Sequence, residues 1–211
     1  VQQAFEQVWR GRAENDPLNR LIIAARMDWR QVTVLRGYLR CLLQTDFTYS
    51  QAYMERTLCS HPLVSRLLVD LFEARFDPDR DGDAKSASEG SRKKLQRDLE
   101  ALLQGDPESL AMATEWAALR GADRETQVRE LNGALREEFE RVASLDEDRI
   151  LRAFRQLIMA SLRTNYYQIE DGRAKDYVAY KLDCSMVPNL PKPLPYREIF
   201  VYSPRVEGVH L

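Results

Sequence analysis

The chain has 211 residues, of which 44% are hydrophobic and 30% charged, and its 31 basic and 33 acidic side chains leave a net charge of -2. This length and composition suffice for a sizeable core in one large or two small domains. Basic and acidic residues are interspersed, which disfavours nucleic acid or a membrane surface as a partner, and no apolar run approaches the roughly 20 residues that span a bilayer.

The N-terminus and the cysteines indicate the cellular compartment of the protein. The N-terminus lacks the pattern of a signal peptide. The chain has three cysteines, at positions 41, 59 and 184. An odd number, a wide spacing and the lack of a CxxC arrangement disfavour a disulfide framework and a zinc site. We therefore expect a cytoplasmic protein with reduced thiols. The chain begins at Val1 rather than Met and ends at Leu211 on an apolar run, so we expect a longer polypeptide around it.

Residues 1–76 are predicted to form a helical subdomain. Proline at the first position of a helix is favourable, so Pro17 and Pro62 mark two helix starts, and the second helix is expected to end near Phe76. Three or four helices packed together are expected in this subdomain.

The strongest helix of this subdomain begins after Asp28. Gln31 follows three residues later, as in a capping box. Apolar residues then recur every three or four positions and form one buried face. They are Trp29, Val32, Leu35, Leu39 and Leu42.

Residues 77–91 are predicted to form a flexible loop, because they contain no large apolar residue whose burial could offset the entropy of ordering them. Asp77–Gly82 matches the first half of an EF-hand loop, with glycine in sixth place. The twelfth position is Ser88 and Glu89 comes one residue late, so a solvated acidic loop is favoured over a calcium site. A metal-dependent enzyme built on Asp77–Asp81 is the least favoured hypothesis.

Residues 92–168 are predicted to form a helical hairpin-like subdomain, interrupted around Gly105–Pro107. Its last helix is expected to start at Ser144, with Glu147 completing a capping box. The acidic residues of its first turn are explained by the helix dipole rather than by catalysis. The apolar positions that carry the helical spacing are Leu95, Leu99, Leu102, Val128, Leu131, Leu135, Phe139, Val142, Leu151, Phe154, Ile158 and Leu162.

Residues 169–211 are predicted to form a β segment, because the apolar period changes from about 3.6 to 2 after Tyr167. Strands are expected at 177–182 and 198–203. Between them, residues 187–195 hold four prolines, which favour a stiff connector that leads into the next domain. An SH3-ligand role for these prolines is disfavoured, because a spacer explains them. The predicted fold class is mainly α: a helical, bundle-like domain followed by a small C-terminal β portion, α+β overall.

A search for chemistry yields no reaction. Nucleophilic catalysis usually needs a histidine beside the nucleophile, and neither His61 nor His210 has a recognisable setting. Cys59 and His61 alone cannot make a zinc site. There is no GxGxxG, Walker loop or HExxH motif. We therefore predict no catalytic, cofactor-binding or metal-binding residue in the chain.

Aromatic and arginine residues near the junction of helix and strand could suggest RNA binding, since bases stack on such side chains. Packing in a core or an interface is the preferred interpretation, because half-buried tyrosines are common at such junctions. The residues concerned are Tyr166, Tyr167, Tyr177 and Tyr180.

Several stretches of the sequence, taken together and in their order along the chain, resemble one family, the large NAD-specific glutamate dehydrogenases of bacteria. The last stretch, EIFVYSPRVEGVHL, is the most specific, and the region 77–144 is the least recognisable. The stretches are Met27–Arg36, Leu71–Pro78, Leu145–Arg152, Leu162–Gln168 and Glu198–Leu211.

The resemblance implies a parent enzyme in which NAD takes hydride from L-glutamate, giving 2-oxoglutarate and ammonium. It places this chain just N-terminal to, and entering, the catalytic core. The family's catalytic lysine and its dinucleotide fingerprint would come later, so NAD is expected to bind the parent enzyme and not this segment. The expected partners are the downstream catalytic domain of the same chain and, in a homo-oligomer, further copies.

The resulting hypothesis is a non-catalytic helical segment that supports the catalytic domain, and a role in oligomerisation or regulation is part of the same expectation. The helices are expected to clamp the start of the substrate domain, to which residues 198–211 contribute strands, because residues 199–202 offer apolar side chains to both faces of a sheet. The alternative is a stand-alone helical interaction module without enzymatic activity.

Overall fold

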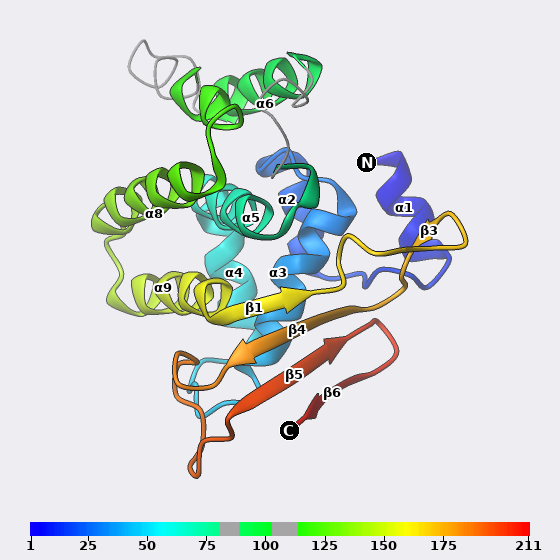
Figure 1. Ribbon diagram of the computed structural model, residues 1–211, viewed down its shortest axis with the longest axis vertical. Helices are drawn as coiled ribbons and strands as arrows, with labels where there is room; N and C mark the ends of the chain where they lie inside the picture. The colour runs from blue at the N-terminus through cyan, green and yellow to red at the C-terminus, as the bar shows by residue number, and fades with distance from the viewer. Residues whose placement is uncertain (81–88, 103–113) are drawn as a thin grey trace.

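The computed structural model describes residues 1–80, 89–102 and 114–211. Helices make up most of the molecule, and a small antiparallel sheet lies along one side of them (Figure 1). The predicted class, mainly α with a small C-terminal β portion, is confirmed. Within the described residues, no helix is long and apolar enough to cross a membrane.

The first helices follow the sequence signals closely. The Asp28 side chain accepts a hydrogen bond from the backbone N–H of Gln31, whose own side chain accepts one from the Asp28 N–H, so the predicted capping box is confirmed. Helix α4 was not delineated from the sequence. The elements are α1 (Gln2–Trp9), η1 (Pro17–Arg20), α2 (Leu21–Ala24), α3 (Trp29–Leu42), α4 (Gln51–Ser60), α5 (Pro62–Phe76) and η2 (Pro78–Arg80).

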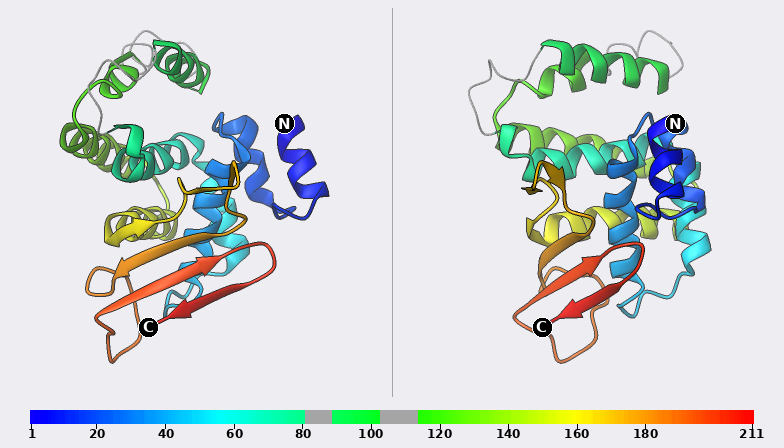
Figure 2. Two further views of the ribbon diagram at one scale, coloured as in Figure 1. Left: turned by 45° about the vertical axis from the view of Figure 1, so that its right-hand side comes forward. Right: turned by 90° about the vertical axis from the view of Figure 1, so that its right-hand side faces the viewer.

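The helices of the second part are α6 (Glu89–Leu102), helical residues 114–119, α8 (Arg124–Glu140) and α9 (Leu145–Ala160). Leu95 and Leu99 of α6 pack against Trp116 in a small cluster, and Trp116 also packs against the main core. Figure 2 shows α6 at the edge of the molecule, away from the sheet. Of the predicted loop, residues 81–88 lie outside the described part, as does the interruption expected around Gly105–Pro107.

Two details of α9 differ from the prediction. Ser144 caps the helix by accepting a hydrogen bond from the Glu147 N–H, but the Glu147 carboxylate does not complete the box: it lies 2.9 Å from His61 Nε2 instead. His61, which lies between α4 and α5, thus binds the carboxylate that a capping box would use. The helix also ends at Ala160, so Leu162, expected on its core stripe, lies in a strand and is 42% exposed.

The main sheet has the strand order β1-β4-β5-β6 and is antiparallel throughout. The predicted strands correspond to β4 and β5, and the proline-rich residues 187–195 contain neither helix nor strand, as expected. The β structure begins at Ser161, earlier than predicted, and the short β2–β3 hairpin was not foreseen. The strands are β1 (Ser161–Thr164), β2 (Ile169–Glu170), β3 (Arg173–Ala174), β4 (Val178–Asp183), β5 (Arg197–Tyr202) and β6 (Glu207–His210).

The sheet packs one face against helix α3. Side chains alternate between buried and partly exposed along β4 and β5, as in a sheet covered on one side. The ring of Tyr180 on β4 stacks on Tyr38 of α3 with 4.2 Å between centroids, and the Tyr38 hydroxyl lies 2.8 Å from Ser161 Oγ. Gly37 lets the strand come this close, because a Cβ there would lie 2.7 Å from Tyr180 Oη.

Candidate functional site

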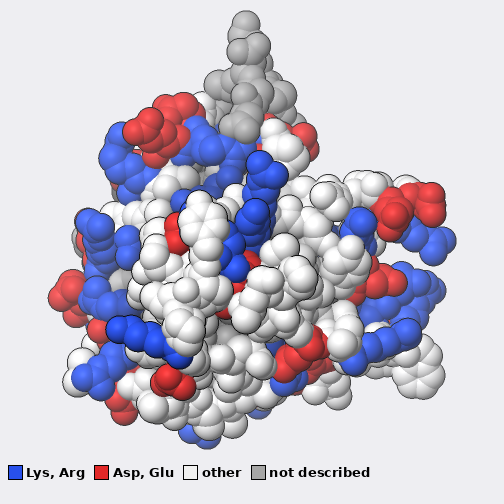
Figure 3. Space-filling model, turned by 60° about the horizontal axis from the view of Figure 1, so that its bottom comes forward, with Lys and Arg blue, Asp and Glu red and all other residues white. Residues whose placement is uncertain are grey.

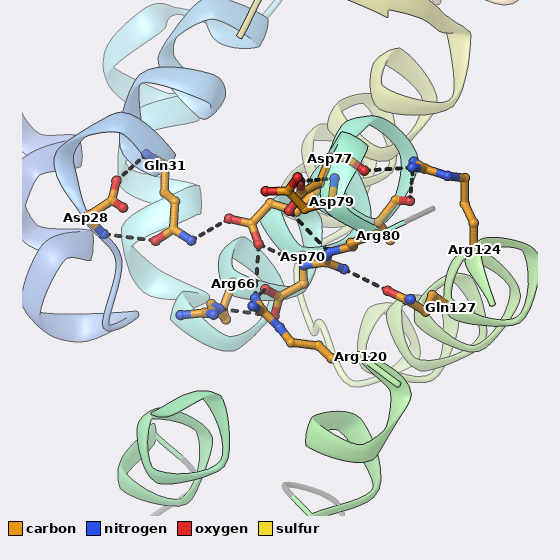
Figure 4. Close-up of polar contacts among 12 residues, drawn as sticks. Asp28, Gln31, Arg66, Asp70, Asp77, Asp79, Arg80, Arg120, Arg124 and Gln127 are labelled. Atoms are coloured by element: carbon orange, nitrogen blue, oxygen red, sulfur yellow. Dashed lines mark hydrogen bonds and ion pairs between the residues drawn. The ribbon is translucent and has the colours of Figure 1, made fainter. Parts of the chain in front are cut away.

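A group of buried and partly buried charges lies where α5 meets α3, η2, α8 and the residues that follow helical residues 114–119 (Figure 4). Two carboxylates of α5, Asp70 and Glu73, are its centre, and we call it the Asp70–Glu73 cluster. Its cations are Arg66, Arg80 and Arg120. A buried charge is costly unless it is paired, and each of the two carboxylates has at least two arginines within 4.0 Å.

Most contacts in the cluster join different elements. Glu73 accepts hydrogen bonds from Arg80 at 2.9 Å, from Arg120 at 3.0 Å and from the side-chain amide of Gln31 on α3 at 2.6 Å. Arg80 also donates to the side chain of Gln127 on α8. The cluster therefore ties together helices that are distant in the sequence.

Asp70 binds Arg66, one turn earlier on α5, at 3.0 Å, and its second oxygen lies 3.6 Å from Arg120. Burial alone would raise the pKa of Asp70, but the attraction of Arg66 and Arg120 is stronger, and the pKa is lowered. The carboxylate therefore stays ionised at neutral pH. An acid–base catalyst needs a pKa near the working pH, so this cluster is suited to holding helices together and not to moving protons.

A second set of ion pairs joins the N-terminal loop to the sheet. The guanidinium of Arg36, itself buried on α3, binds Asp16 through two nitrogens, one of them at 2.8 Å. Glu14 accepts a hydrogen bond from the Tyr202 hydroxyl of β5 at 2.7 Å and another from Arg40 at 2.8 Å. The inner face of the sheet is thus fixed to α3 by polar contacts as well as by aromatic packing.

The outer face of the sheet has no helix packed on it among the described residues. The register places Lys181, Ile199 and His210 side by side on this face. Ile199 and Val201 are only partly buried there, whereas their neighbours Phe200 and Tyr202 on the inner face are fully buried. Figure 3 shows a broad, largely uncharged area on the face of the molecule that includes this side.

Strand β6 forms one edge of the sheet. Its residues are all exposed, and among the strands of the described ranges it pairs with β5 alone. The backbone groups that point away from β5 are therefore free to bind another strand or a covering segment. The outer face and this edge together form a surface that is incompletely covered within the described residues.

The residues weighed as catalytic from the sequence are dispersed. His61 pairs with Glu147, the Cys59 thiol donates to the Pro17 carbonyl at 3.3 Å, and His210 lies exposed on β6. Asp77 accepts a hydrogen bond from the Asp79 N–H, and residues 81–88 of the calcium-like motif lie outside the described residues. In the described part of the chain, no three His, Cys, Asp or Glu residues are grouped as metal ligands.

Three of the four tyrosines expected to pack at the helix–strand junction do pack there. Tyr180 is fully buried, while Tyr166 and Tyr167 contact Phe72 of α5. Tyr177 is 43% exposed and borders a cleft. Burial raises the pKa of Tyr166, Tyr167 and Tyr180, so these hydroxyls stay neutral.

The Asp70–Glu73 cluster was missed from the sequence. On α5, Arg66, Asp70 and Glu73 are spaced four and three residues apart, as in the ion pairs that commonly decorate an exposed helix face. Only the packing of α8 and Arg120 over them reveals that they are buried. The unbroken apolar pairs along α5 were the one available signal that this helix is buried on several sides.

Two protein-family models match the chain. The model described as glutamate dehydrogenase, helical motif 3, matches residues 13–78, and the model described as bacterial NAD-glutamate dehydrogenase, catalytic domain, matches residues 134–211. The second match begins within α8 and includes the whole sheet.

Curated relatives match the chain almost from end to end. It is 44% identical to the NAD-specific glutamate dehydrogenase of Halomonas elongata over 99% of its length, and 41% identical to that of Mycobacterium tuberculosis over 99%. Identity to the Pseudomonas aeruginosa enzyme of the same name is 39% over 100% of the chain. The chain spans only 10% to 11% of the length of these relatives.

Proposed function

The chain belongs to the NAD-specific glutamate dehydrogenase family of bacteria, and from this premise we propose that it is a non-catalytic segment that holds the first strands of the catalytic domain on a helical support. The observation that carries the proposal is the difference between the two faces of the sheet. Its inner face is fixed to α3, while its outer face and the β6 edge are incompletely covered within the described residues.

The proposed activity of the whole protein is the oxidation of L-glutamate by NAD. Hydride leaves the α-carbon for NAD, and water hydrolyses the resulting imine, so that glutamate, NAD and water give 2-oxoglutarate, ammonium and NADH. Such a reaction needs groups that hold the substrate carboxylates and a group that transfers protons in a closed site. The role proposed for this segment is to position the strands on which such a site is built.

The described residues do not fit NAD. Dinucleotide binding uses a parallel sheet in which a glycine-rich turn leads from a strand into a helix, so that the helix N-terminus faces the pyrophosphate. Here the strands are antiparallel, and none of the described strands leads directly through such a turn into a helix. We propose that NAD is bound by other parts of the longer protein, and we assign no step of the reaction to residues of this segment.

The proposal includes the downstream catalytic domain as the partner that covers the outer sheet face. A strand such as β5, with apolar side chains on both faces, is typical of a sheet that is covered on both sides. Assembly into a homo-oligomer, a regulatory role and a cytoplasmic location stay predictions from the sequence.

Substitution on the outer face tests this role. Ile199→Lys places a charge where the proposal expects a dry contact, while the inner face of β5 keeps its packing on α3. In the full-length enzyme we expect at least a tenfold loss of kcat/KM for glutamate, measured by NADH formation. A charge introduced into an apolar contact commonly costs several kcal/mol, which exceeds the 1.4 kcal/mol that a tenfold change represents.

Ile23→Lys is the matched control, because Ile23 is 64% exposed on α2. It should leave the activity within about twofold of the unaltered enzyme, as expected for a surface substitution. Full activity of the Ile199→Lys enzyme would contradict the proposed contact. Slow amide exchange of α3 in both variants would show that the helical support itself remains folded.

A further inference from the structure

A cleft lies between the N-terminal helices and the sheet, apart from the Asp70–Glu73 cluster, and Val201 of the outer sheet face forms part of its lining. Its walls come from the turn after α1, the start of α3, the residues before β4 and the turn between β5 and β6. In Figure 1 these segments lie on the right-hand side of the molecule, where α1 is next to the β2–β3 hairpin.

The cleft is large enough for a small metabolite. Its outer part has a volume of about 340 Å³, and a recess of about 30 Å³ adjoins it. The two parts share Arg12, Asp176, Tyr177, Ser203 and Pro204. Pockets that bind small ligands usually begin at about 300 Å³.

Positive charge dominates the lining. Arg12, Arg30, Lys175 and Arg205 border the two parts, against Asp176 as the single acidic residue among the lining residues described.

Most of these cations lack an acidic partner. Arg30 donates to the Tyr166 carbonyl at 2.5 Å and lies over the Tyr166 ring, and Lys175 is 3.6 Å from the exposed Glu170. Within residues 1–80, 89–102 and 114–211, neither Arg12 nor Arg205 has a carboxylate within 4.0 Å. Arg12 is nevertheless partly buried, so its charge is only partly solvated.

Aromatic and apolar groups complete the lining. Trp29 and Tyr166 line the recess, and Tyr177 borders both parts. Val201 and Val206 contribute aliphatic surface to the outer part. Guanidinium groups bind carboxylate and phosphate oxygens through paired hydrogen bonds, and the apolar walls suit a short carbon skeleton.

We propose that this cleft binds a small organic anion, whose carboxylate or phosphate oxygens are held by Arg12 and Arg205. The ligand lies between the N-terminal loop and the turn from β5 to β6, so its binding fixes that turn against the helical support. This inference does not rest on the proposed function, because it needs only the residues that line the cleft and no contact with the catalytic domain.

The test compares the full-length protein with its Arg12→Gln/Arg205→Gln variant. Each is titrated with succinate and, separately, with inorganic phosphate at constant ionic strength, and binding is followed by isothermal titration calorimetry. For the unaltered protein we expect a saturable site for one of the two probes, with at least tenfold weaker binding in the variant. Binding of succinate alone would identify carboxylate as the recognised group, and binding of phosphate alone would identify a phosphate ester.

Arg129→Gln serves as the control, since Arg129 is exposed on α8 and pairs with its neighbour Glu130. This variant should bind the probe as the unaltered protein does. Either probe can also occupy other sites of the full-length protein, but such binding is the same in all three proteins and cancels in the comparison. The proposal is overturned if neither probe binds, or if the double variant binds as tightly as the control.

Discussion

Among single residues, Asp70 has the clearest link between burial and pH. It is 5% exposed, and its pKa is lowered because Arg66 and Arg120 outweigh the effect of burial. A lowered pKa in the folded state adds stability above the unfolded pKa of about 3.9, and this stability is lost as the pH falls through the folded value. Asp70→Asn should therefore cost about 3 kcal/mol at pH 7, since it leaves Arg66 without its charged partner.

Urea denaturation of the chain at pH 7 and at pH 3 measures this effect. The difference between the unaltered chain and Asp70→Asn should shrink at the lower pH. Glu140→Gln is the control, because the Glu140 side chain is 77% exposed, and it should change stability by no more than about 0.5 kcal/mol. An equal loss for Asp70→Asn at both pH values would show that charge pairing is not what Asp70 contributes.

The stability that Glu198 on β5 contributes should depend on pH in the opposite direction. Glu198 is 4% exposed, forms no ion pair among the described residues, and burial raises its pKa. A raised pKa in the folded state gives stability that is complete below the unfolded pKa of about 4.3 and is lost as the pH rises through the folded value. Glu198→Gln cannot ionise, so its Tm should exceed that of the unaltered chain at pH 8 and equal it at pH 4.

Thermal unfolding at the two pH values tests this expectation, with Glu137→Gln on the exposed side of α8 as the control. The control should show the same Tm difference from the unaltered chain at both pH values. If Glu198→Gln lowers the Tm at pH 8, the carboxylate has a stabilising partner in the folded protein.

At the scale of elements, the contact between α3 and β4 depends on Gly37. A Cβ at this position would lie 2.7 Å from Oη and 2.9 Å from Cε2 of Tyr180, a fully buried ring. Alanine favours a helix over glycine by about 1 kcal/mol, but overpacking a core costs about 1–3 kcal/mol. Gly37→Ala should therefore lower the free energy of unfolding, measured with urea.

A double-mutant cycle separates this clash from other effects. Tyr180→Phe removes the oxygen nearest the new methyl group, although it also loses the hydrogen bond to the Val34 carbonyl. The cost of Gly37→Ala should be smaller in the Tyr180→Phe background. Gly37→Ala that stabilises the chain, or that costs the same in both backgrounds, would contradict the close approach of strand and helix.

Elements with strong local signals could be predicted from the sequence. Asp28 and Pro62 mark helix starts through local hydrogen bonding and backbone geometry, so α3 and α5 begin where expected. The end of α9 was misplaced because Leu162 continues the helical spacing, yet pairing with β4 draws the chain into β1 from Ser161 onward. Tertiary pairing of this kind leaves no local mark in the sequence.

At the scale of the whole molecule, the sequence indicated the family and a strand with apolar residues on both faces. It did not indicate the polar contacts that join distant elements. The resemblance depended on the order of several stretches, and the apolar run 199–202, which supplies both faces of β5, was visible in the residues themselves. The Asp70–Glu73 cluster and the basic cleft were not predictable, because each joins residues from elements far apart in the chain. Their positions follow only from the packing of helices on the sheet.

The central claim is that the β6 edge and the outer sheet face are covered by the rest of the catalytic domain in the full-length enzyme. Amide hydrogen exchange of Glu207–His210 tests it directly, by comparison of the full-length protein with the 211-residue chain, and the amides of α3 report folding in both. We expect the outward-pointing amides of β6 to exchange slowly in the full-length protein and rapidly in the chain. Rapid exchange of these amides in both proteins would contradict the account.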